Sequence, residues 1–321
     1  MQPSVCIVIL NWNGLNDTIE CLESLKKINY KNYRIIVVDN GSKNDEGKIL
    51  KEKFGDYIYL IQNDKNYGFA EGNNIGMKYA LKNGADYVLL LNNDTIVESN
   101  FLDELVKAIS KHNKDRVEMA ACKILNYPDK KTINAVWSSV YKRGLFRGKG
   151  YGITDRGQYN KEKIVFGPSG CCALYSKKLL EDTKIDDDYF DKSLFAYHED
   201  IDLNFRAQLR DWKCIYAPKS VIYHKHSQSL GKESPKKSYL CLKNNLIVLF
   251  KNLPKKLFLK YFFYIILYQI LSFGYHLLTG KIMGVKGQIQ GIKDFPKYSR
   301  KRQIIQKNKK VSNKYIASIL N

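Results

Sequence analysis

Residues Tyr87 to Thr95 read YVLLLNNDT, an apolar run that ends on two asparagines and one aspartate. Such a run is typical of a strand buried in a parallel sheet, and ligands of these sheets bind where the strands end. Asn92, Asn93 and Asp94 therefore predict the floor of a binding site. An isolated Asn-Asn-Asp is more often a simple turn, so the interpretation depends on the neighbouring strands.

Three further apolar runs precede this one, and stretches with helical periodicity separate them. The predicted strands are residues 5–10, 34–38, 57–61 and 87–91, and the predicted helices are 17–27, 45–53 and 70–82. Strands and helices that alternate at this spacing predict an α/β fold with a Rossmann-like, mostly parallel sheet.

The other strands also end on polar residues. Asn11 follows the first strand, and Asp39 and Asn40 follow the second. A carboxylate at the end of the second strand can accept hydrogen bonds from a nucleoside, although capping of the next helix is an alternative. Residues 66–76, NYGFAEGNNIG, place glycines and amides before a helix, which suits a polar or anionic ligand.

Two later clusters carry groups able to do chemistry. In residues 198–202, HEDID, three carboxylates lie within four positions and repel one another, which favours a base or a metal site over a charged helix start. His224 and His226 follow the predicted strand KSVIY. A histidine at a strand end can be a metal ligand or a structural residue, and the sequence leaves both open.

Charge divides the chain of 321 residues unevenly. Residues 232–321 hold 19 Lys or Arg against two acids, which accounts for +17 of the total charge of +21. Within this part, residues 261–280 contain no charged residue, and tyrosines at spacings of three and four predict a helix with a Tyr-rich face and an aliphatic face. With lysines at both ends, it suits a helix lying in a membrane interface, with a core helix or a true span as alternatives.

The seven cysteines form no CxxC pair and no metal-binding spacing, which indicates a reducing compartment. The opening MQPSVCIVIL has an apolar run too short for a signal peptide, and we interpret it as the first strand. These features favour a cytoplasmic location.

Taken together and in order, these motifs resemble the inverting family 2 glycosyltransferases, especially the rhamnosyltransferase-like enzymes of bacterial surface polysaccharide synthesis. The matching segments are VCIVILNWNG, IIVVDNGSKND, NYGFAEGNNIG, LLLNNDT, GPSGCCALYSKKLL, YFDKSLFAYHEDIDLNFRAQLRDW and YAPKSVIYHKHSQS. The resemblance implies a GT-A fold with a catalytic domain over residues 1–231, divided into a nucleotide-sugar half (1–98) and an acceptor half (99–231). A basic amphipathic helical region over 232–321 would follow and associate with the membrane.

The resemblance also implies a role for each candidate residue. Asp200, beside Glu199, matches the general base of an inverting transfer. Asp94 matches the last acid of a DxD-type motif, in which Asn92 replaces the first acid, and His224 would join Asp94 in holding Mg²⁺ or Mn²⁺. The implied donor-binding residues are Asn11, Asp39, Asn40, Asn66, Gly68, Asn73, Asn74, Asn92 and Asn93.

The implied reaction moves a sugar, with rhamnose as the first choice, from a dTDP or UDP sugar to a hydroxyl of a lipid-linked glycan. The basic C-terminal part fits an anionic membrane surface, so we expect a peripheral or monotopic protein on the cytoplasmic face of the bacterial inner membrane. We expect no nucleic-acid partner, because aliphatic runs such as FFYIILYQIL suit lipid better than bases.

Other functions stay open. One is a UDP-hexose or UDP-N-acetylhexosamine transferase of the same fold. A nucleotidyltransferase would need a basic, glycine-rich phosphate loop near the first strand, and NWNGLND lacks one. A non-catalytic membrane or nucleic-acid-binding scaffold is the alternative of another class, against which Asp94, Asp200 and His224 together argue.

Overall fold

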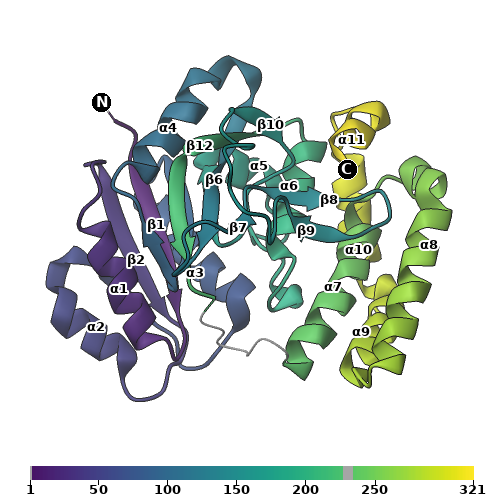
Figure 1. The fold of residues 1–321 in the computed structure, drawn as a ribbon, viewed down its shortest axis with the longest axis horizontal. Coiled ribbons are helices and arrows are strands. Elements are labelled where there is room, and N and C mark those ends of the chain that lie inside the picture. The colour runs from purple at the N-terminus through teal and green to yellow at the C-terminus, as the bar shows by residue number, and fades with distance from the viewer. Residues whose placement is uncertain (1, 227–233) are drawn as a thin grey trace.

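The computed structural model describes residues 2–226 and 234–321 and shows an α/β body with a helical bundle beside it (Figure 1). The N-terminal strands are β1 (Val5–Asn11), β2 (Tyr33–Asp39), β3 (Tyr59–Gln62) and β4 (Tyr87–Asn92), and the helices between them are α1 (Leu15–Leu25), α2 (Glu46–Phe54) and α3 (Gly68–Lys82). These bounds confirm the predicted order of strands and helices.

The second half of the body extends the same sheet. Its strands are β5 (Thr95–Val97), β6 (Val117–Asn126), β7 (Ile133–Ala135), β10 (Lys163–Val165), β11 (Cys172–Ser176) and β12 (Lys213–His224), with α4 (Phe101–Lys111), α5 (Lys177–Thr183) and α6 (Glu199–Leu209). The main order is β10-β12-β6-β11-β4-β1-β2-β3, and β8 (Ser138–Val140) and β9 (Phe146–Gly148) form a separate pair. The strands β1 to β4 pair in parallel, but β11 runs antiparallel to both β4 and β6, so the sheet as a whole is mixed.

The apolar runs form strands because the sheet is covered on both faces. Along β1, Ile7 and Ile9 face a core built with α1, α2 and α4, while Cys6 and Val8 face a second core built with α3, α5 and α6. A strand buried on both sides reads as a continuous hydrophobic run, which is why the period-two alternation is absent from the sequence.

The C-terminal helices pack against the α/β body instead of standing apart from it. They are α7 (Pro235–Asn252), α8 (Lys255–Leu278), α9 (Ile282–Lys293), α10 (Phe295–Lys307) and α11 (Asn313–Ile319). A third apolar core joins Ile201 and Phe205 of α6 to Ile247 and Val248 of α7 and to Ile305 of α10.

A buried ionic network ties α7 to the body. The ammonium group of Lys251, on α7, is fully buried and lies 2.5 Å from a carboxylate oxygen of Asp191 and 2.8 Å from one of Asp202. Asp202 also pairs with Arg206 at 3.1 Å, and Lys301 of α10 lies 2.7 Å from Asp191. The third carboxylate of HEDID is therefore neither a base nor a metal ligand but an anchor for the C-terminal helices.

Helix α8 is the outermost helix of the bundle (Figure 1). Within the described part of the chain it is the one helix with the length and composition to cross a membrane, and only 17% of its most apolar window is buried. The predicted helix forms, and spacings of three and four place Tyr261, Tyr264 and Tyr268 on one side of it. Tyr261 on that side is buried, whereas Phe263 and Leu267 on the other side are exposed.

Candidate active site

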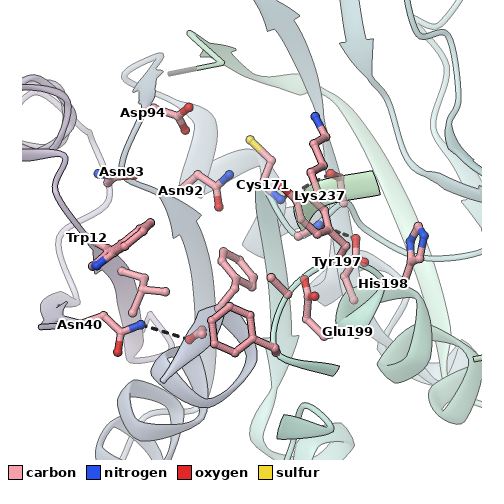
Figure 2. A pocket seen from close by; sticks show the side chains of 18 of the residues that line it. Trp12, Asn40, Asn92, Asn93, Asp94, Cys171, Tyr197, His198, Glu199 and Lys237 are labelled. Carbon is pink, nitrogen blue, oxygen red and sulfur yellow. Dashed lines mark hydrogen bonds between the residues drawn. The ribbon is translucent and has the colours of Figure 1, made fainter. Parts of the chain in front are cut away.

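A pocket of about 440 Å³ opens where β1, β2 and β4 end and α6 begins (Figure 2). The candidates that line it are Asn40, Asn66, Gly68, Asn92, Asn93, Asp94, Glu199, Asp200 and His224. They come from positions up to 184 residues apart in the sequence, from Asn40 to His224. Figure 2 shows Asn92 pointing into the pocket between Trp12 and Cys171.

Four predicted donor-binding residues lie outside the lining. Asn11 is fully buried, and its amide nitrogen donates to Asp39, Ser42 and Glu46, so Asn11 and Asp39 hold the ends of β1 and β2 together. On α3, the Asn73 amide donates to the Phe69 carbonyl and Asn74 bonds both backbone groups of Phe190. Because the side-chain amides of Asn11, Asn73 and Asn74 are hydrogen-bonded within the protein, these residues support the pocket wall from behind instead of lining the pocket.

Asp94 and His224 meet because of strand pairing. The antiparallel ladder of β5 with β12 sets His224 opposite Thr95, and the Lys225 N–H donates to the Asp94 carbonyl at 2.9 Å. As a result, the His224 Nε2 lies 3.0 Å from an Asp94 carboxylate oxygen, with both residues buried. The other ring nitrogen of His224, Nδ1, is buried and has no hydrogen-bond partner within the described residues.

This pair fits a divalent metal ion. Two neighbouring ligands at about 2.1 Å from an octahedral ion lie about 3 Å apart, which is the separation of the Asp94 oxygen and the His224 nitrogen. Among residues 2–226 and 234–321 there is no group of three or more His, Cys, Asp or Glu side chains placed to hold a metal. A metal here would therefore need ligands from a substrate and water, as Mg²⁺ sites at phosphates commonly do.

Glu199 and Asp200 face the pocket from the first turn of α6. The Gly170 N–H donates to one Asp200 oxygen at 2.8 Å, and the Ile201 N–H donates to the other at 2.8 Å. A Cβ on residue 170 would lie only 3.3 Å from the Asp200 Cβ, so a glycine permits this close approach.

The two carboxyl groups differ in how they are held. Burial, and then the neighbouring Asp200, raise the pKa of Glu199 to about 8, and its Oε2 has no partner within the described residues. Burial also raises the pKa of Asp200, but its two backbone N–H bonds favour the charged form. Burial thus favours the protonated form of Glu199, whereas the two N–H groups bind the charged form of Asp200, which suits a base.

The loop before α6 lines the pocket beside Gly68, and the Ala70 N–H donates to the Phe195 carbonyl at 3.0 Å. Phe195, Tyr197 and His198 all have left-handed φ angles, of 65°, 69° and 70°, which are uncommon outside glycine. The fully buried amide of Asn244 on α7 donates to the carbonyls of Leu194, Ala196 and Tyr197, each at 2.9 Å. Helix α7 thereby fixes the loop that leads into Asp200.

The pocket also contains residues that were not among the sequence candidates. These are Leu10, Trp12, Phe69, Asn134, Ser169, Gly170, Cys171, Phe195, Ala196, Tyr197 and Lys237, while His198 and His226 belong to the two clusters identified from the sequence. Trp12 directly follows Asn11 at a strand end, so the strand-end rule could have found it. Lys237 had no such signal, because only the packing of α7 brings it to the pocket.

Comparison with known proteins agrees with this architecture. The family model described as glycosyl transferase family 2 matches residues 4–184. The low-salt glycan biosynthesis hexosyltransferase Agl10 of Haloferax volcanii is 25% identical over 65% of this chain and 62% of its own length. The dTDP-rhamnosyl transferase RfbF of Shigella flexneri is 27% identical over 33% of this chain and 34% of its own length. The matched regions thus span less than two thirds of either relative.

The fold is that of solved glycosyltransferases. A crystal structure of GalNAc-T7 with UDP, GalNAc and Mn²⁺ superposes with a TM-score of 0.58, covering 77% of this chain and 48% of that protein, at 15% identity. This likeness confirms the predicted GT-A-like sheet.

Proposed function

The chain belongs to glycosyl transferase family 2, and from this we propose that it is an inverting enzyme that moves a hexose from a nucleoside diphosphate sugar to an acceptor hydroxyl. The observation that supports this proposal best is the joint placement of the Asp94–His224 pair and Asp200 around one pocket. The Asp94–His224 pair fits a metal bound to the donor, and Asp200 fits a base for the acceptor.

The nucleotide-sugar would enter over the ends of β1, β2 and β4. The side chain of Asn40 donates to the Asn66 side chain at 3.1 Å and to the Gly68 carbonyl at 3.2 Å, which shapes the wall on that side. Gly68 has a φ of 88°, and a Cβ there would lie 2.6 Å from the Phe195 carbonyl oxygen, so only glycine fits. Asn92 and Asn93 would face the donor from β4.

We propose that Asp94 and His224 hold the metal, Mg²⁺ or Mn²⁺, at the donor diphosphate. The bound ion would supply Lewis-acid stabilisation of the leaving phosphate oxygen. GalNAc-T7 was solved with Mn²⁺, which supports a divalent metal here.

Asp200 would act on the acceptor. The acceptor hydroxyl attacks the anomeric carbon, the bond from that carbon to the diphosphate oxygen breaks, and Asp200 takes the hydroxyl proton. Protonated Glu199 beside it would keep a second negative charge out of the same buried corner.

Rhamnose from dTDP-rhamnose is our first choice of donor sugar. Its support is the resemblance of the motifs to rhamnosyltransferases and the partial match to RfbF. A UDP sugar is the alternative, because GalNAc-T7 binds UDP and the Haloferax relative is named a hexosyltransferase.

We further propose that the acceptor is a lipid-linked glycan and that residues 232–321 hold the enzyme on the cytoplasmic face of the membrane. Helix α8 exposes large apolar side chains between basic ends. They are Leu259, Phe262, Phe263, Tyr264, Ile266, Leu267, Ile270, Leu271, Phe273, Tyr275, Leu277 and Leu278. An apolar patch of this extent commonly marks an interaction surface, and the charge of +17 around it favours anionic lipid.

The reaction is tested with UDP- and dTDP-sugars, each with Mg²⁺, Mn²⁺ or a chelator. We expect turnover of one donor that the chelator abolishes, and His224→Ala to raise the metal concentration needed for half-maximal rate by about ten- to a hundredfold. No turnover of any donor, with tight lipid or nucleic-acid binding, would favour a non-catalytic scaffold.

Membrane attachment is tested by flotation with vesicles that contain phosphatidylglycerol. Phe263, Leu267 and Ile270 are 83%, 57% and 62% exposed and lie on one face of α8, so replacing all three with Ser should release the protein from the vesicles. Ile49→Ser, at an exposed position on α2, is the control and should float like wild type. Wild-type protein that stays soluble at low salt would refute the attachment.

A further inference from the structure

Helix α7 directs three residues toward the pocket and its supporting loop. Lys237, Asn244 and Lys251 are spaced by seven residues, so they lie along one face of the helix. Asn244 binds the carbonyls of the 194–197 loop, and Lys251 binds Asp191 and Asp202. The same face continues to Lys237, which lines the pocket together with Cys171 and Tyr197 (Figure 2).

Lys237 stands alone as a cation in this pocket. The lining carries the carboxyl groups of Asp94, Glu199 and Asp200, and within the described residues Lys237 is its one Lys or Arg. None of the ion pairs found between described residues involves Lys237, and its ammonium lies 6.0 Å from the centroid of the Tyr197 ring. By contrast, Lys251 is paired with two carboxylates.

The charges of the proposed reaction require such a group. A nucleoside diphosphate sugar carries two negative charges, and the nucleoside diphosphate that leaves carries three. Asp94 and Asp200 add two more, so a single divalent metal leaves the pocket negative. As the bond to the sugar breaks, Asp200 gains the acceptor proton and the negative charge concentrates on the leaving diphosphate. A fixed cation aimed at the developing charge lowers the energy of that step.

We propose that Lys237 binds the diphosphate of the donor and stabilises the charge on the leaving nucleoside diphosphate. This inference rests on the proposed function. No proton passes to or from Lys237 in this step, because the acceptor proton goes to Asp200 and the electron pair of the broken bond goes to the phosphate oxygen. The C-terminal helices would in this way contribute directly to the reaction.

The test compares Lys237→Met, Lys237→Arg and Lys236→Met. Lys236 is the matched control, since it is the preceding residue on the same helical turn but lies over the Phe195 ring and outside the pocket lining. Binding of UDP and dTDP, each against its monophosphate, is measured by calorimetry with Mg²⁺, together with kcat and KM. Melting temperatures confirm that each variant is folded.

Lys237→Met should weaken diphosphate binding about ten- to a hundredfold, lower kcat, and change monophosphate binding little. Lys237→Arg should retain most of the affinity, and Lys236→Met should match wild type. Equal diphosphate binding by wild type and Lys237→Met would overturn this inference alone. A wild type that binds neither diphosphate would overturn the proposed function, and the inference with it.

Discussion

Asp200→Asn is expected to lower kcat by roughly two to four orders of magnitude while leaving the Kd of the donor almost unchanged. The amide keeps the shape of the carboxylate and can still accept the N–H of Gly170 or Ile201. It cannot take the proton of the acceptor hydroxyl. Single-turnover kinetics with the preferred donor, combined with calorimetric binding of that donor, separate the two effects.

Asp202→Asn is the contrasting variant on the same helix. Asp202 is fully buried and paired with Lys251 and Arg206, so its loss should lower the melting temperature more than the rate measured in the folded state. If Asp200→Asn kept most of the wild-type kcat, the proposed base would be wrong.

In the wild type, the raised pKa of Asp200 should move the acidic limb of the rate profile to higher pH than for an ordinary aspartate.

Lys251→Met is expected to destabilise the protein by about 3 kcal/mol, because it removes one partner from a buried ionic network. Asp202 would remain paired with Arg206, and Asp191 with Lys301. The expected loss of stability is therefore at the lower end of the range for broken buried ion pairs. Denaturant unfolding measures the difference. Lys256→Met, at an exposed position on α8, should change the free energy of unfolding little.

The same network predicts how stability varies with pH. Burial opposes ionisation, but Lys251 and Lys301 hold the pKa of Asp191 well below its usual range, and Lys251 and Arg206 lower the pKa of Asp202. A depressed carboxyl pKa stabilises the fold above the unfolded value of about 4, and this contribution is lost as the pH falls below it. Between about pH 5 and 2, the free energy of unfolding should fall less steeply for Lys251→Met than for wild type. Identical slopes would contradict the network's role.

The N-terminal half was predictable from sequence because its signals are local. Strands β1 to β4 are continuous apolar runs, and the residues at their ends meet since parallel strands end at one edge. Asn40, Asn92 and Asp94 could be placed near one another on this basis alone.

The rest depends on partners far away in the sequence. Asn11 and Asn74 looked like ligand-binding amides, yet their hydrogen bonds go to Asp39 and Phe190, which periodicity cannot indicate. In the HEDID cluster, Asp200 is the base candidate and Asp202 is an anchor. This difference is visible only because Lys251, 49 residues after Asp202, pairs with Asp202. A wholly buried lysine could not be foreseen, because lysine is rarely found inside proteins without a paired acid.

The contacts of Lys251 and Asn244 on α7 with the α/β body limit how chimeric enzymes can be built. Exchanging everything after residue 231 between related enzymes would leave Asp191 and Asp202 without Lys251, and the loop before Asp200 without Asn244, unless the incoming helix supplied both. The unit that can be inherited or transplanted intact therefore includes α7, and also α10, because Lys301 pairs with Asp191 and Ile305 packs in the third apolar core. A different membrane anchor would best replace the exposed face of α8 and leave these helices in place.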